Sequence, residues 1–454
     1  MTTLQEAMVK AEVVGKSEVM DHPVEGDEFL SLDELVPVGK DAAKRSLKRI
    51  LAEAEELIRE KKWEDMAALF RPVEEKAPEL VEHGLDTVLR AKVAFALGHL
   101  NRFDEAIEEL SLCVERQPDN FLFQSSLGFT AYNSLFAAAN REIFLRGKVR
   151  RERMGLAHRH LGKAQELRPD GVTNFYREGM LFKNIERKIE KALPLFQRAV
   201  ANWDSLTEEQ QQARHQERKN FVKALYQTAG SLLHSGAAKQ ALKAMKRCIP
   251  IDEKTHYLSL VYKYFALGKI HFEMNNFQEA RDALLFASKV KINENDDFVY
   301  ELLGRTYLAL GNPSRALEII NKVPEKRRRA YYRWTEADIL CAMKDFARAR
   351  SVLVQSQERD NRSRHKALLR LAKIDYMTGN FAESMKHAAM AGRFFQDKWG
   401  NRYYEAVFWE ALGAYRSGDR GKAMELATEL KAHNPHYPKL EMLLERLKAE
   451  GSRK

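Results

Sequence analysis

The sequence has few of the residues that interrupt helices or cross-link chains. Proline accounts for only 12 of the 454 residues, and cysteine for three. Scarce proline beside abundant alanine, leucine, glutamate, lysine and arginine favours long helices over a large sheet. Cys113, Cys248 and Cys341 are far apart and odd in number, so we expect no disulfide framework and a reducing environment.

Long apolar runs and targeting signals are also missing. No apolar stretch approaches the ~20 residues that a membrane-spanning helix needs. The first residues, MTTLQEAMVKAEVVGKSE, lack the apolar segment of a secretory signal. We therefore expect a cytoplasmic protein with no membrane contact.

The motifs of common enzymes are absent too. The chain contains no GxGxxG, no Walker loop, no HExxH and no GxSxG. His158 and His160 form an HxH pair, but that spacing on a helix turns the two side chains apart, which disfavours a metal site. We predict no catalytic residue, no cofactor and no metal, so the protein is not expected to be an enzyme.

Charge is distributed unevenly along the chain. The net charge is +10, but residues 1–40 hold nine acidic side chains and three lysines, a net charge of −6. The remaining 414 residues therefore carry +16. The basic body can bind anionic partners, or it can bind the acidic arm of its own chain. The simpler interpretation is that these charges only make the surface soluble.

Internal similarity is the most informative feature of the sequence. The segments NRFDEAIEELSLCVERQPDN at 101–120, NNFQEARDALLFASKVKINEN at 275–295 and GNPSRALEIINKVPEK at 311–326 share one pattern. Each has a turn residue, an alanine five positions later, and apolar residues four and seven beyond that alanine. A second amphipathic segment precedes each turn, so the pattern predicts helix, tight turn and helix with a period of about 34 residues.

The residues of this pattern resemble the tetratricopeptide-repeat (TPR) family. The fullest match is Tyr300, Leu303-Gly304, Tyr307, Gly311, Ala316, Ile320 and Val323. Small residues at the Gly and Ala positions let the two helices approach closely, and the larger residues fill the space between them. The resemblance implies an all-α, right-handed superhelical solenoid of about ten helix-turn-helix repeats.

Ten repeats can be placed in register. They begin near residues 47, 87, 121, 172, 222, 261, 297, 330, 365 and 404. The small position of each second helix falls on Met66, Ala106, Ala157, Ala192, Ala241, Ala280, Ala316, Ala349, Ser384 and Ala423. Met66 and Ser384 make the first and ninth repeats degenerate.

The predicted domains follow from this register. Residues 1–40 form an acidic, largely disordered N-terminal arm, residues 41–437 form the solenoid, and residues 438–454 form a capping helix and tail. The third repeat contains an insertion near residues 136–152, which we expect to lengthen both of its helices. The long polar link at 204–220 begins with a helix-start pattern at Ser205 or Thr207, and we interpret it as a lengthened first helix of repeat five.

The resemblance also implies a binding surface, because three positions along each first helix line the concave groove of TPR proteins. An aromatic and basic strip in repeats seven to nine has the composition of a peptide site. The candidate partner-binding residues are Glu301, Arg305, Tyr331, Trp334, Asp338, Lys366, Arg370 and Lys373. For Trp334 the alternative is a packing aromatic displaced by one residue from the family position.

Two functions remain open at this point. The leading one is a non-catalytic adaptor or scaffold that binds a protein or peptide partner through its groove. The alternative is a helical-repeat protein that binds RNA or single-stranded nucleic acid. It rests on the basic runs at 146–153, 326–333 and 359–366, with Tyr331, Tyr332 and Trp334 stacking on bases. A contact between the acidic arm and the groove is a further hypothesis.

Overall fold

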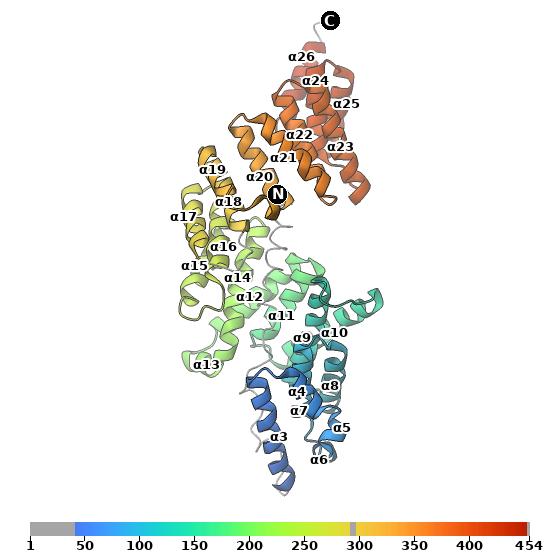
Figure 1. Ribbon diagram of the computed structural model, residues 1–454, viewed down its shortest axis with the longest axis vertical. Helices are drawn as coiled ribbons and strands as arrows, with labels where there is room; N and C mark the ends of the chain where they lie inside the picture. Colours follow the sequence, from blue (N-terminus) through green and yellow to red (C-terminus); the bar gives the residue numbers. More distant parts are fainter. Residues whose placement is uncertain (1–40, 291–296, 452–454) are drawn as a thin grey trace. The chain divides into compact units, whose positions relative to one another are not determined.

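The computed structural model describes residues 41–290 and 297–451, and within these ranges all regular structure is helical (Figure 1). The described chain divides into two compact units, with the division between Ile270 and His271, inside α16. The predicted N-terminal arm and residues 452–454 lie outside the described residues. The predicted all-α fold is confirmed.

The helices of the first unit are α3 (Asp41–Arg59), α4 (Trp63–Phe70), α5 (Val73–Lys76), α6 (Pro78–Glu82), α7 (Thr87–His99), α8 (Phe103–Arg116), α9 (Phe121–Ala139), α10 (Gly147–Leu167), α11 (Thr173–Met180), the π-helix η1 (Leu181–Glu186), α12 (Ile189–Asp204), α13 (Glu208–Ala213), the 3-10 helix η2 (His215–Glu217), α14 (Arg218–His234) and α15 (Ala238–Ile251), followed by α16 (Leu260–Glu273) at the division. Those of the second unit are α17 (Phe277–Lys289), α18 (Asp297–Ala309), α19 (Pro313–Ile320), the 3-10 helix η3 (Glu325–Arg327), α20 (Ala330–Ala342), α21 (Phe346–Arg359), α22 (Arg364–Met377), α23 (Phe381–Trp399), α24 (Tyr404–Ser417), α25 (Arg420–His433) and α26 (Leu440–Gly451).

These helices include ten successive pairs, each joined by a short turn or loop. The pairs are α3 and α4, α7 and α8, α9 and α10, α11–η1 and α12, α14 and α15, α16 and α17, α18 and α19, α20 and α21, α22 and α23, and α24 and α25. The predicted small position of every second helix, from Met66 to Ala423, is 0% exposed. Ten buried residues at ten predicted positions confirm the register of the repeats.

Two backbone features explain why one pattern produces ten similar pairs. The first is close approach: a Cβ added at Gly128 in α9 would lie 2.8 Å from the backbone nitrogen of Leu161 in α10, so only glycine fits there. A Cβ added at Gly304 in α18 would lie 2.9 Å from the end of the Ile320 side chain, which would have to move. Small residues therefore set the spacing between paired helices.

The second feature is a residue with positive φ in the turn of every pair. These residues are Lys61, Asn101, Arg141, Arg187, Gly236, Asn275, Gly311, Lys344, Gly379 and Gly418, with φ between 57° and 91°. The left-handed conformation ends the first helix and directs the chain back along it. Four of the ten turns use lysine or arginine, which adopt this conformation at a cost.

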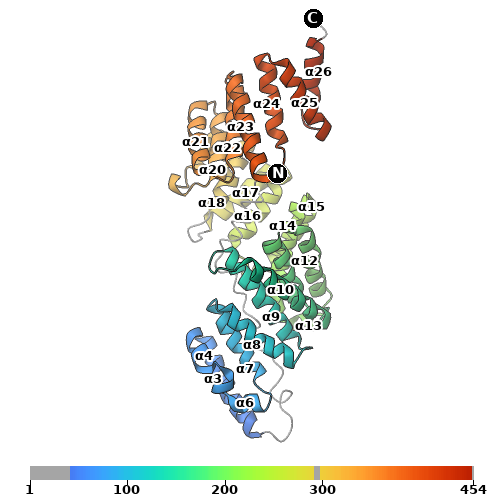
Figure 2. The same cartoon turned by 90° about the vertical axis from the view of Figure 1, so that its right-hand side faces the viewer.

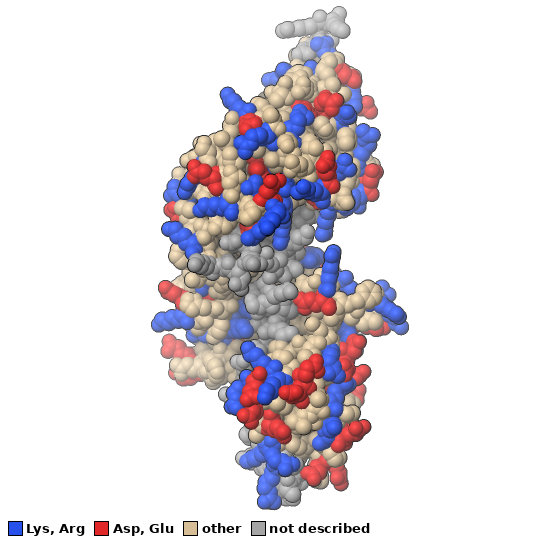
Figure 3. Space-filling model, viewed as in Figure 1, with Lys and Arg blue, Asp and Glu red and all other residues tan. Residues whose placement is uncertain are grey.

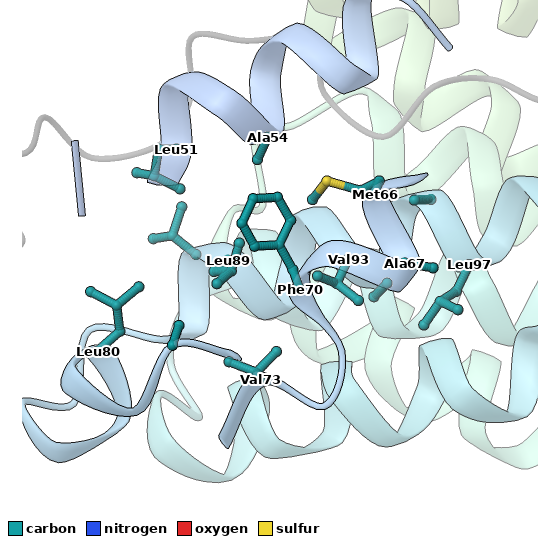
Figure 4. Packing of buried hydrophobic residues seen from close by; sticks show 14 of the residues in the cluster. Leu51, Ala54, Met66, Ala67, Phe70, Val73, Leu80, Leu89, Val93 and Leu97 are labelled. Carbon is teal, nitrogen blue, oxygen red and sulfur yellow. The ribbon is translucent and has the colours of Figure 1, made fainter. Parts of the chain in front are cut away.

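The first repeat shows how a degenerate pair is filled. Met66 occupies the position of the small residue and lies with Phe70 between α3, which contributes Ala54, and α7, which contributes Leu89 and Val93 (Figure 4). The larger side chain on α4 replaces the alanine of the other pairs at interior packing density.

The third pair carries the predicted insertion. Its helices α9 and α10 are 19 and 21 residues long, compared with 13 and 14 for α7 and α8. Residues 140–146 connect the two long helices, and they project from the body of the first unit (Figures 1 and 2).

The prediction for the link at 204–220 was wrong. The segment is not an extension of the first helix of repeat five but a separate short helix, α13, followed by the 3-10 turn η2, and α14 begins only at Arg218. Thr207 caps α13 and forms a capping box with Gln210. The cap starts a helix at the predicted place, but this helix ends at Ala213 and does not continue into α14.

The last helix, α26, packs on the tenth pair. Leu440, Leu443, Leu444 and Leu447 are buried against α24 and α25, including Phe408. The opposite side of α26 is exposed and largely polar. The proposed boundaries of arm, solenoid and cap remain predictions.

Candidate partner-binding surface

The eight candidate residues lie on three first helices of the second unit. Glu301 and Arg305 belong to α18, the residues from Tyr331 to Asp338 to α20, and those from Lys366 to Lys373 to α22. Helix α18 contacts α20, α20 contacts α22, and α22 contacts α24. We call the surface made by α18, α20, α22 and the start of α24 the first-helix face.

Ion pairs and hydrogen bonds join neighbouring repeats across this face. The carboxylate of Asp338 accepts from Nε and Nη2 of Arg370, both at 3.0 Å. Lys373 Nζ donates to Glu405 Oε1 of α24 at 2.8 Å. These partners are 32 residues apart, which is close to the repeat period. The positive charge of Arg370 and Lys373 is therefore already balanced, and the predicted basic strip is a surface of mixed charge.

Glu301 is the most buried charged group of the set. It accepts a hydrogen bond from Thr335 Oγ1, one repeat later in the chain. Burial raises the pKa of Glu301, although Arg305 and Thr335 act in the opposite direction. Arg305 itself lies over the ring of Phe272, 4.7 Å from its centroid.

Trp334 is a packing residue, which is the alternative that the sequence left open for it. Its side chain is only 6% exposed and packs against Leu340 and Leu371, among others. One side of the indole still faces cations, because Lys366 Nζ and the Arg370 guanidinium lie 5.7 and 5.5 Å from the ring centroid. The indole Nε1 is buried without a hydrogen-bond partner in the described part of the chain.

The same ion pairs shift the pKa values of Glu405 and Arg370. Burial alone would raise the pKa of Glu405. The positive charges of Lys373 and Arg370 lower this pKa by more than burial raises it, so the net shift is downward. Burial likewise lowers the pKa of Arg370, and Asp338 more than offsets this, so that pKa is raised. Both shifts favour the ionised forms of Glu405 and Arg370.

Two of the three aromatic residues proposed to stack on nucleic-acid bases, Tyr332 and Trp334, are buried. Tyr332 is 0% exposed and donates its hydroxyl to the carbonyl of Ile320 at 2.7 Å. In the run at 326–333, Arg328 pairs with Glu336, and Arg333 lies near Glu325. The buried ring of Tyr332 and the paired arginines weaken the nucleic-acid alternative at the run 326–333, and that alternative is not favoured.

The cysteines lie in packed helices, not in a site. Cys113 and Cys248 are fully buried, and burial raises the pKa of each thiol to about 12. Burial also raises the pKa of Cys341, to about 11. Thiols with raised pKa values are poor nucleophiles at neutral pH.

The HxH pair behaves as its spacing predicted. His158 bridges two carboxylates, with Nδ1 2.9 Å from Glu178 and Nε2 2.7 Å from Glu186, whereas His160 faces Gln124. Burial lowers the pKa of His158, but the two carboxylates raise it above its usual value. Across residues 41–290 and 297–451, no group of three or more His, Cys, Asp or Glu is arranged to hold a metal ion.

None of the described helices combines the length and apolar character that crossing a bilayer requires. The ten helix pairs, their buried small positions and their left-handed turn residues are those of a tetratricopeptide-repeat array. The chain has the helical-repeat fold that the sequence pattern indicated.

No family model matches the chain, and no curated protein matches it. It is similar to the solved structure of yeast Tom70, with 14% identity over 90% of this chain and 89% of that chain and a TM-score of 0.46. It is similar to a tetratricopeptide repeat protein from Parabacteroides merdae, at 15% identity over 60% of this chain and 93% of that chain, with a TM-score of 0.42. It is also similar to PilW, a type IV pilus biogenesis factor, at 14% identity over 49% of this chain and 98% of that chain, with a TM-score of 0.41.

Proposed function

We propose that this protein is a non-catalytic adaptor or scaffold that binds a protein partner through the first-helix face. One observation supports the choice of this face above all: its polar groups are held in place by contacts between repeats, from Glu301–Thr335 through Asp338–Arg370 to Lys373–Glu405. Groups that are already fixed lose little conformational entropy when a partner binds.

The exposure of the paired groups supports the same proposal. The side chain of Arg370 is 28% exposed and that of Asp338 is 44% exposed, so both can still bond to a second group. Guanidinium and carboxylate alternate along the face, which favours a partner segment that carries charges of both signs. The cytoplasmic location is part of this proposal and is supported by three cysteines that form no disulfide.

A charge swap tests the face without breaking its internal pair. In the double variant Asp338→Arg/Arg370→Asp, the two groups still attract each other, but each presents the opposite charge to a partner. We expect the variant to keep its helical content and to bind at least tenfold more weakly a partner first identified by capture on the full chain from native cells.

The same unit offers a matched control. Arg402 and Glu429 form another two-point pair, at 2.7 and 3.0 Å, away from the candidate residues. Exchanging these two side chains changes the same charges and should leave partner affinity unchanged. Equal affinity of the Asp338/Arg370 swap and the original protein would show that the partner binds elsewhere.

A further inference from the structure

The α9–α10 projection consists of the connection between the two helices and the start of α10, residues 140–152. It has an exposed aromatic side chain near its centre. Phe144 is 86% exposed, which is the largest value among the exposed large hydrophobic residues of the described chain. Its neighbour Leu145 packs against the core cluster that contains Leu135 and Phe136. Because Leu145 anchors the loop, Phe144 is presented outward by a segment that is fixed at its base.

Four exposed arginines lie within seven residues of this phenylalanine in the sequence. Arg141, Arg146, Arg150 and Arg151 have no ion pair or hydrogen bond to any described side chain, in contrast to Arg153 just beyond the projection, which pairs with Asp104. Figure 3 shows Lys and Arg side chains gathered where the projection leaves the first unit. These cations are thus available to a ligand.

The projection also contains Lys148, whose Nζ lies 3.9 Å from Glu152. With Glu142 as the second acidic residue, the thirteen residues carry a net charge of +3. An exposed aromatic ring amid unpaired guanidinium groups fits a segment that combines carboxylates with apolar side chains.

This chain contains such a segment itself. Residues 18–34, EVMDHPVEGDEFLSLDE, hold seven acidic side chains and no lysine or arginine, and they include Phe29, Leu30 and Leu32. Residues 18 and 34 precede the first described helix by 23 and seven residues, and extended chains of those lengths reach ~80 Å and ~25 Å. A segment tethered in this way is present at a high effective concentration.

We propose that the α9–α10 projection is the docking surface for residues 18–34 of the same chain. This surface is distinct from the first-helix face, where Asp338 and Glu405 already balance Arg370 and Lys373. The arginines around Phe144 have no such partners. The acidic arm therefore gains more charge complementarity at the projection than in repeats seven to nine.

Zero-length carbodiimide coupling of the full chain tests this proposal, because it joins a lysine amine only to a carboxylate in direct contact. We expect Lys148 to become linked to acidic residues within 18–34, in a yield that does not depend on protein concentration. The yield should fall as salt is raised from about 0.05 to about 0.5 M, because screening shortens the range of the attraction.

Two variants of the projection and one control define the outcome. Arg150→Gln/Arg151→Gln and, separately, Phe144→Ser should each lower the yield of the link about threefold or more, and all three positions are exposed, so the fold is not at risk. Lys243→Gln/Lys246→Gln removes two exposed charges from α15 and should leave the yield unchanged.

Several results would overturn the proposal. They are no link from Lys148 to residues 18–34, links formed only between two copies, or equal yields in the projection variants and the original chain. Binding of phosphatidylserine vesicles through Phe144, with no link to the arm, would overturn it in favour of a membrane ligand.

Discussion

Arg370 reaches back one repeat to Asp338, and the two side chains make a two-point contact through Nε and Nη2. The pair converts a predicted basic site into a neutral link between α20 and α22. Its position on a partly exposed surface sets how much it can contribute to stability, because solvent screens such pairs.

We predict that this pair contributes little to folding. A double-mutant cycle with Asp338→Asn and Arg370→Gln should give a coupling free energy of about 0.5–1 kcal/mol in urea unfolding. A coupling well above this range would mean that the pair is structural, and that loss of binding in its variants reflects damage to the fold.

The turns predict a stability change of known sign. Lys344 holds a φ of 64° in the turn between α20 and α21, where four other pairs have glycine. Lys344→Gly should raise the free energy of unfolding by roughly 0.5–1 kcal/mol, because glycine adopts this conformation without strain.

Gly311 and Gly230 are the controls for that experiment. Gly311→Ala should lower stability by about 1 kcal/mol, since Gly311 has a φ of 76°. Gly230 lies within α14 with open space around an added Cβ, so Gly230→Ala should instead raise stability by up to about 1 kcal/mol. The same sign for Gly311→Ala and Gly230→Ala would contradict the role assigned to the turns.

The buried arginine of the second repeat predicts a large loss. Arg90 is 1% exposed, and its guanidinium binds Asp86, Glu109 and Glu74. Arg90→Met would remove the central cation of this cluster and leave Asp86 with Arg116 alone and Glu109 with Arg71 alone, which costs up to about 3–5 kcal/mol. Urea unfolding measures the loss, and Arg59→Met, which alters an exposed pair, should change stability by well under 1 kcal/mol.

His365 predicts a loss of stability in mild acid. Burial, and then the charge of Lys366, lower the pKa of this buried ring to about 4. The unfolded chain binds the proton near pH 6.5, so the stability contributed by the neutral ring is complete above pH 6.5 and declines as the pH falls towards 4.

At pH 5 this decline amounts to about 2 kcal/mol. His365→Phe suits the surrounding rings of Phe395 and Tyr403 and removes the titrating group. Unfolding free energies at pH 7 and pH 5 should therefore differ by about 2 kcal/mol less in the variant than in the original chain. An identical pH dependence in both proteins would show that folding does not lower the pKa of His365.

The pattern of the sequence predicts the repeats well because it records local constraints. A buried residue where the helices cross recurs in every pair, and the turn residue lies five positions earlier in all pairs but the third, so even Met66 and Ser384 could be placed. The link at 204–220 was mispredicted because a capped helix start at Thr207 does not reveal where the helix ends.

The site could be predicted only in part. The spacing of the repeats placed Asp338, Arg370 and Lys373 on first helices, but a composition of aromatic and basic residues does not show which charges are already paired. The signal was present in the sequence, since Asp338 and Arg370, like Lys373 and Glu405, are 32 residues apart. Phe144 was missed because it lies in an insertion, where the repeat pattern gives no position to compare.

The links Glu301–Thr335, Asp338–Arg370 and Lys373–Glu405 have a mechanical consequence. Each joins one first helix only to the next, so they act in series and not in parallel. Under a pulling force every link in the series bears the same load, and the weakest one opens while the others hold.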